Sequence, residues 1–153
     1  MKYLLVVDLQ KEFVRDRQGQ KVYDKCLQFI EDHRHEYQAV LACVYINQGN
    51  PNMNRLVGWN EVKNPASLDF VPDATYMHAG YSIKEYPYVK PSDTIDIIGF
   101  DTDACVLCAA FDVFNLGCDM RILAEYCWSS GGKRMHEAGL RVMERQFGKA
   151  VIK

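Results

Sequence analysis

The sequence lacks any apolar stretch approaching the roughly 20 residues that cross a membrane. Its first apolar run is interrupted by Asp8, Lys11 and Glu12 before it could form the core of a signal peptide. The formal net charge of -2 gives no excess of Lys and Arg to attract nucleic acid or an anionic membrane. These absences predict a cytoplasmic protein whose partners are small molecules or other proteins.

Internal repeats, low-complexity segments and domain linkers are also missing from the sequence. With 153 residues, of which 48% are hydrophobic, the chain has the length of one domain and can bury a sizeable core. Such a core does not need disulfide bonds, so we expect most of the six cysteines to be reduced. We predict a single domain over residues 1–153.

Short apolar runs alternate with amphipathic segments along the chain. Nearly continuous runs are typical of strands buried on both faces, and they cover Tyr3 to Val7, Ala39 to Ile46, Thr94 to Ile98, Met120 to Leu123 and Ala150 to Ile152, with a weaker run ending near Met77. Between them, apolar residues recur at helical spacing from Val22, Val106 and Met135 onwards. This pattern predicts an α/β fold with three layers (α/β/α) and a doubly wound, mostly parallel, six-stranded sheet.

Residues 47 to 72 interrupt the alternation, because they are rich in Asn, Pro and Gly. A long connection of this kind is typical of a lid over a substrate pocket or of a contact between subunits. Residues 80 to 93 form a second irregular stretch, which contains Pro87 and Pro91.

Polar residues that follow buried strands are the first candidates for chemistry, because doubly wound sheets bind ligands at the carboxyl ends of their strands. Asp8 directly follows the first run. Cys105 lies where the third run leads into a helix that Thr102 or Asp103 can cap. A helix N-terminus favours the thiolate, and its N–H groups can bind an oxyanion. A loop-capping Asp8 and a buried helix cysteine at position 105 are the alternatives.

A histidine and a lysine follow the weaker run, at His78 and Lys84. A cation at this place would stabilise the Cys105 thiolate and could pass protons between the nucleophile, the substrate and Asp8. Alternatively, His78 packs at a strand end and Lys84 is a solvated loop residue.

Together these segments resemble the isochorismatase-like (nicotinamidase-related) cysteine hydrolase superfamily over nearly the whole chain. The family's Asp-x-Gln followed by a phenylalanine is matched by Asp8, Gln10 and Phe13. Its Gly-x-x-Thr-Asp-x-Cys-Val signature is matched without a gap by residues 99 to 106. Two further segments, 122 to 127 and 136 to 140, also look like the family.

The resemblance implies hydrolysis of a small-molecule amide or a related bond through a covalent thioester. Asp8 would act as general base, and Cys105 would be the nucleophile. The backbone N–H groups of Asp101 and Cys105 would form the oxyanion hole, and the peptide bond Phe100–Asp101 would be cis.

The third catalytic residue departs from the family pattern. The family's Lys-x-x-Tyr-Ser reads His78-Ala79-Gly80-Tyr81-Ser82 here, so His78 stands in the place of the lysine. Lys84 would supply the ammonium only if the following loop turned back toward the site. We therefore keep both residues as candidates.

The metal pattern of nicotinamidases is also missing. Where they carry Asp-x-His after the second strand, this chain has Asn47-Gln48-Gly49, and amides are poor zinc ligands. We expect a metal-independent enzyme without a cofactor.

Three aromatic residues, Phe13, Trp59 and Tyr81, are candidate walls of a substrate pocket. The resemblance also implies a homo-oligomer, either a dimer or a tetramer. Two other functions stay open: a non-catalytic family member that binds a ligand or a partner protein, and a redox protein using Cys105-Val106-Leu107-Cys108.

Overall fold

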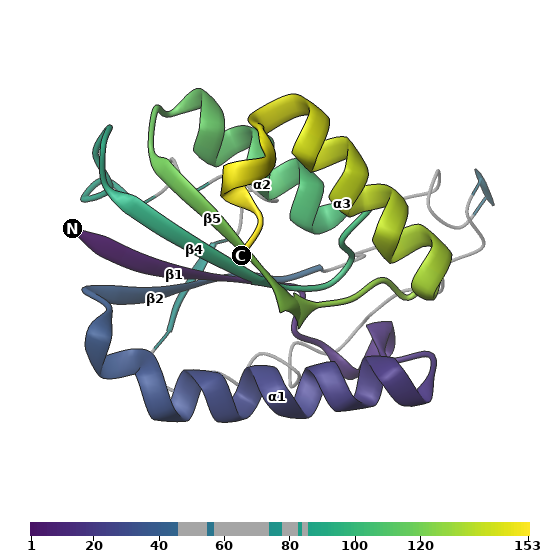
Figure 1. Cartoon of the computed structure of the whole chain (residues 1–153). Coiled ribbons are helices and arrows are strands. Elements are labelled where there is room, and N and C mark those ends of the chain that lie inside the picture. Colours follow the sequence, from purple (N-terminus) through teal and green to yellow (C-terminus); the bar gives the residue numbers. More distant parts are fainter. Residues whose placement is uncertain (46–54, 57–73, 78–82, 84–85) are drawn as a thin grey trace.

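The structure, a computed structural model, describes residues 1–45, 55–56, 74–77, 83 and 86–153 (Figure 1). Its parallel sheet has the order β3-β2-β1-β4-β5. The strands are β1 (Lys2–Val7), β2 (Ala39–Cys43), β3 (Thr75–Met77), β4 (Thr94–Gly99) and β5 (Asp119–Cys127).

Helices cover both faces of the sheet (Figure 1). The long helix α1 (Arg17–His33) lies on one face, and α2 (Cys105–Asn115) and α3 (Lys133–Phe147) lie side by side on the other. Short 3₁₀ helices occur at Lys11–Phe13, Arg34–Glu36 and Lys149–Val151. The predicted three-layer α/β/α fold is therefore confirmed.

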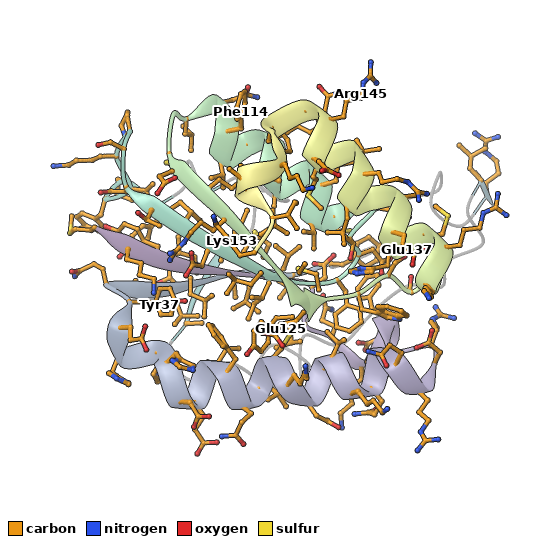
Figure 2. The ribbon with its side chains drawn as sticks, in the orientation of Figure 1. Tyr37, Phe114, Glu125, Glu137, Arg145 and Lys153 are labelled. Atoms are coloured by element: carbon orange, nitrogen blue, oxygen red, sulfur yellow. The ribbon has the colours of Figure 1, made fainter. Side chains whose placement is uncertain are left out.

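The central strand β1 is buried on both faces, which explains its uninterrupted apolar sequence. Successive side chains of a strand point to opposite faces, so Tyr3, Leu5 and Val7 pack with the α2 and α3 side of the core. Leu4 and Val6 pack with the α1 side. The side chains that fill the two layers between helices and sheet are drawn in Figure 2.

The last apolar run differs from the other predicted strands, because it pairs with the sheet at one residue alone. Residues Lys149–Val151 form a 3₁₀ helix, and only Ile152 pairs with the sheet, as a single bridge to Ile122. The run is too short to turn out of α3 at Gly148 and then extend along β5. The described residues therefore contain five strands and one isolated bridge.

The strand order places a topological switch point between β1 and β4. The connection after β1 leads through α1 to β2 on one side, and the connection after β4 leads through α2 to β5 on the other. Ligands of doubly wound sheets bind in the crevice that opens where the order reverses. The residues that follow Val7 and Gly99 are therefore the place to look for a site.

None of the helices in the described part of the chain is long and apolar enough to cross a membrane.

Candidate active site

Asp8 is the first residue after β1, and it is fully buried. Its N–H donates to the carbonyl of Cys43 at 2.9 Å, which extends the pairing of β1 and β2 by one hydrogen bond. Its φ of 45° then turns the chain away from the sheet, a conformation that aspartate tolerates better than most residues. The carboxyl group is thereby held at the carboxyl end of the central strand.

Gln10 ties the ends of β1 and β2 together with its side chain. Its Nε2 donates to the carbonyl of Tyr45 at 3.0 Å, and its Oε1 accepts from the N–H of Tyr45 at 2.7 Å. The Tyr45 ring meets Phe13 edge to face, with centroids 6.0 Å apart. Burial raises the pKa of Tyr45, and the nearby Cys105 and Asp8 raise it further. Tyr45 therefore lies within electrostatic reach of both predicted catalytic residues.

The loop after β4 carries the predicted nucleophile. Gly99 has a φ of 124°, and a Cβ at this position would lie 1.9 Å from the carbonyl oxygen of Val7. The peptide bond after Phe100, which joins it to Asp101, is cis. The carbonyl of Asp101 accepts hydrogen bonds from the N–H groups of Ala104 and Val106, at 3.1 and 2.9 Å. These bonds fold the loop into a tight turn that leads directly into α2.

Cys105 is the first residue of α2 and is 9% exposed. The residue before it, Ala104, is the N-cap and makes no side-chain hydrogen bond. The prediction that Thr102 or Asp103 caps this helix is therefore wrong. Within the described part of the chain, no backbone carbonyl accepts a hydrogen bond from the N–H of Asp101.

The connection between β5 and α3 holds this loop in place with hydrogen bonds. The Asp101 carboxylate accepts from the Ser130 N–H at 2.5 Å and from the Ser130 hydroxyl at 2.7 Å. The Thr102 N–H donates to the Trp128 carbonyl at 3.1 Å. Burial raises the pKa of Asp101, although the two bonds from Ser130 act in the opposite direction. The Asp101 side chain is thus engaged by Ser130.

The sequence profile of the Isochorismatase domain matches residues 2–152. The chain belongs to the isochorismatase family. No curated protein matches the chain significantly. The resemblance identified from the motifs around Asp8 and Cys105 is thereby confirmed.

Solved structures of isochorismatase-like proteins share the fold at low sequence identity. An isochorismatase-like hydrolase from Alkaliphilus metalliredigens is 19% identical, with a TM-score of 0.75 over 94% of this chain and 91% of that one. A pyrazinamidase/nicotinamidase from Streptococcus mutans is 17% identical, with a TM-score of 0.76 over 100% of both chains. A pyrazinamidase from Pyrococcus horikoshii, solved in complex with zinc, is 20% identical, with a TM-score of 0.74 over 99% and 97%.

Five residues predicted for the site of this isochorismatase-family chain are brought to one edge of the sheet. They follow β1 and β4, and they are Asp8, Phe13, Phe100, Asp101 and Cys105. The other four, Trp59, His78, Tyr81 and Lys84, lie outside the described residues. Of the neighbouring residues, Ile83 is buried and donates its N–H to the Asp112 carboxylate on α2 at 2.9 Å.

Sequence reasoning misses Tyr45 as a site residue. The apolar pattern places it within the run from Ala39 to Ile46, although β2 ends at Cys43. The available signal is its hydroxyl, a polar group two residues after the end of a buried strand.

The described residues contain no group of three or more His, Cys, Asp or Glu side chains that could hold a metal ion. Residues 47 to 50, where nicotinamidases would carry metal ligands, lie outside the described residues. None of the six cysteines forms a disulfide bond.

Proposed function

We propose that this isochorismatase-family chain is a cysteine hydrolase that cleaves a small-molecule amide or a related bond. One observation carries the proposal: a buried aspartate and a cysteine at a helix N-terminus follow adjacent parallel strands at the switch point of the sheet. The register supports it, because Val7 and Gly99 are direct partners, so Asp8 and the loop carrying Cys105 leave the sheet at the same level.

The proposed reaction begins when the Asp8 carboxylate accepts the proton of the Cys105 thiol. The sulfur then attacks the substrate carbonyl, while the N–H groups of Asp101 and Cys105 stabilise the oxyanion. The carbon–nitrogen bond breaks as Asp8 returns its proton to the leaving nitrogen, which leaves a thioester on Cys105. Water, deprotonated by Asp8, attacks the thioester to give a carboxylic acid, and the thiol is regenerated.

A cation beside Cys105 completes the proposed triad, with His78 and Lys84 as the two candidates. Either group would lower the free energy of the thiolate. His78 directly follows β3 in the sequence, after Met77, which pairs with Cys43 of β2. Met77 thus ends β3 at the carboxyl end of the sheet, on the same edge as Asp8.

The substrate pocket is proposed to have aromatic walls. Phe13 and Tyr45 are in edge-to-face contact at the ends of β1 and β2, and Trp59 and Tyr81 are the further candidates from the sequence. Aromatic rings at the mouth of a crevice suit a planar substrate. Nicotinamide and pyrazinamide, the amides named for two of the structural relatives, are therefore suitable first probes.

Metal independence is part of the proposal, and it rests on donor chemistry. The segment after β2 reads Asn47-Gln48-Gly49-Asn50, which offers amides in place of the carboxylate and imidazole groups that zinc prefers. We expect hydrolysis to persist after exhaustive dialysis against a chelator. Loss of activity on chelation, with recovery on adding zinc, would contradict this part.

The test of the nucleophile is ammonia release from a panel of small carboxamides that includes the two probes. We expect Cys105→Ala and Asp8→Asn each to reduce the rate by at least about 1,000-fold, as for members of a catalytic unit. Cys108→Ala is the matched control, because Cys108 is an exposed thiol on the same helix. Full activity of both Cys105→Ala and Asp8→Asn would contradict the proposal.

Alkylation by iodoacetamide tests the nucleophile without a known substrate. Partial desolvation and the neighbouring Asp112 raise the pKa of Cys108, so we expect this thiol to react slowly and use it as the internal standard. Peptide mass spectrometry should show Cys105 reacting at least about ten times faster than Cys108 near neutral pH, since only thiolates react. Equal rates would favour a non-catalytic protein that binds a ligand or a partner.

A further inference from the structure

Helix α3 contacts the nucleophile loop at two positions, Gly139 and His136. A Cβ on Gly139 would lie 2.7 Å from the backbone of both Thr102 and Asp103, so the helix and the loop touch backbone to backbone. His136 lies three residues earlier, on the same side of the helix. The α3 backbone therefore packs directly against the backbone of the loop at Thr102 and Asp103.

The Thr102 hydroxyl makes the side-chain contact between loop and helix. Thr102 is fully buried, and its Oγ1 lies 2.8 Å from Nδ1 of His136. Its own N–H is fixed to the Trp128 carbonyl. Thr102 directly follows Asp101 and precedes Cys105 by three residues, so its backbone conformation sets the relation between the two N–H groups of the proposed oxyanion hole.

The His136 ring is itself held on its other side. It packs on Trp128 with centroids 4.9 Å apart and planes tilted by 33°. The Trp128 indole N–H lies 3.2 and 3.3 Å from the two carboxylate oxygens of Asp16. Asp16 also caps α1, by accepting from the Gly19 N–H at 2.6 Å. A chain of contacts thus runs from α1 through Trp128 and His136 to Thr102.

We propose that His136 is a positioning residue, which acts through the Thr102 hydroxyl to hold the N–H groups of Asp101 and Cys105 in the arrangement that stabilises the oxyanion and the thiolate. This inference rests on the proposed cysteine hydrolase function. It gives α3 a part in the reaction, although the residues proposed to react, Asp8 and Cys105, follow β1 and β4.

The surroundings suit a neutral imidazole. Burial lowers the pKa of His136, while Glu137 on its own helix and Asp103 on the loop act in the opposite direction. Lys133, one turn earlier, lies 3.7 Å from Glu137 and offsets part of its charge. A neutral ring has one donor and one acceptor nitrogen, so Nδ1 can pair with the Thr102 hydroxyl without bringing a charge into the loop.

The decisive comparison is between His136→Asn and His136→Gln. An asparagine amide occupies the place of Nδ1 and keeps the contact with Thr102, whereas a glutamine amide reaches toward the place of Nε2. We expect His136→Asn to stay within about threefold of the wild-type kcat, and His136→Gln and His136→Leu to lose about tenfold or more with KM little changed, as expected when oxyanion stabilisation weakens.

Thr102 gives the complementary test from the loop. Thr102→Ser keeps the hydroxyl and should retain activity, whereas Thr102→Val, which has the same shape, should match His136→Leu. The double variant Thr102→Val/His136→Leu should be no worse than either single variant, because both remove one contact. Additive losses would overturn the inference.

The pH profile of Cys105 alkylation separates the two proposals. In His136→Leu the apparent pKa of the Cys105 thiol should rise, with the alkylation rate at neutral pH reduced about tenfold, while urea unfolding shows a folded protein. If wild-type Cys105 reacts fast and His136→Leu leaves its profile unchanged, the positioning role is wrong and the hydrolase proposal stands. If wild-type Cys105 reacts no faster than Cys108, the hydrolase proposal fails first.

Discussion

Gly99 is the residue on which the approach of β4 to β1 depends. Its φ is 124°, and a Cβ added there would lie only 1.9 Å from the Val7 oxygen, which leaves no room for a side chain. Phe100 then donates its N–H to the same Val7 oxygen at 2.8 Å. A residue with a Cβ would therefore push apart the strands that carry Asp8 and Cys105.

We predict that Gly99→Ala lowers the free energy of unfolding by more than about 4 kcal/mol or prevents folding, because strain and a backbone clash act together. Urea denaturation followed by circular dichroism measures this loss. Gly148→Ala is the control: Gly148 also has a positive φ, 92°, but nothing lies near its missing Cβ. Gly148→Ala should lower the free energy of unfolding by only about 1–3 kcal/mol, the cost of a positive φ in a residue with a Cβ. Equal losses in the two variants would show that the clash at Gly99 is unimportant.

Local sequence motifs are sufficient to predict some site residues and insufficient for others. Asp8 directly follows a buried apolar run, and Cys105 lies where another run leads into a helix, so their position at the sheet edge can be predicted from the strands. Tyr45 depends on the hydrogen bonds of Gln10, which lies 35 residues away. Thr102 is one of two residues predicted to cap α2, the other being Asp103, but its hydroxyl pairs with the His136 ring, 34 residues further on. Contacts between distant segments are not encoded in any local pattern.

At the scale of helices, the residue that caps α1, Asp16, also contacts Trp128, which follows β5. Asp16 accepts from Gly19 within the helix and from the Trp128 indole beyond it. We predict that Asp16→Ala costs about 1–2 kcal/mol of unfolding free energy, and that Asp16→Asn, which keeps an acceptor, costs less. Urea denaturation of the two variants checks this order. A loss in Asp16→Asn as large as in Asp16→Ala would contradict the capping role.

The stability contributed by α3 should depend on pH through His136. Because burial lowers the pKa of His136 in the folded protein, the unfolded chain binds more protons below the ordinary histidine pKa of 6.5. This contribution is therefore fully present above pH 6.5 and decreases as the pH falls toward the lowered folded value. Urea denaturation from pH 7.5 to 5 should show a smaller decline in His136→Asn than in the wild type. Parallel declines would contradict it.

The end of α3 also explains why the last apolar run forms a 3₁₀ helix and a single bridge. Gly148 turns the chain out of the helix, and only a few residues remain to reach the edge of β5. The apolar character of residues 150 to 152 is used in packing, since Val151 and Ile152 contact the core beside Ile122. Hydrophobicity therefore predicts burial correctly, but it cannot distinguish a strand from a 3₁₀ turn.

At the scale of the whole molecule, the alternation of apolar runs and amphipathic helices is enough to predict the layers and the parallel sheet. The order of the strands is less accessible, because it depends on which side of β1 each crossover takes. The two crossovers run to opposite sides of the β1–β4 pair, and this places the Asp8 and Cys105 segments next to each other. A site at a switch point can thus be expected from the sequence, but the sequence does not specify which two strands flank that point.

We propose that the chain assembles as a dimer or a tetramer, as the family resemblance implies. Phe111 and Phe114 on α2 are 39% and 50% exposed, and their rings lie 4.9 and 5.1 Å from that of Phe147 on α3. Phe114 lies at the outer surface of the helix (Figure 2). Exposed apolar clusters of this kind favour contact with another protein surface. Sedimentation equilibrium should give two or four times the mass of one chain, and a monomer at micromolar concentration would contradict the prediction.

The side-chain amide of Gln10 makes the two hydrogen bonds that a backbone peptide group would make in a sheet. Beyond the last backbone bond between the two strand ends, the Gln10 amide meets the Tyr45 backbone with one donor and one acceptor, as a residue of a neighbouring strand would. A shorter residue at position 10 could not make both hydrogen bonds, so the length of one side chain decides whether the segment after β1 stays joined to the segment after β2.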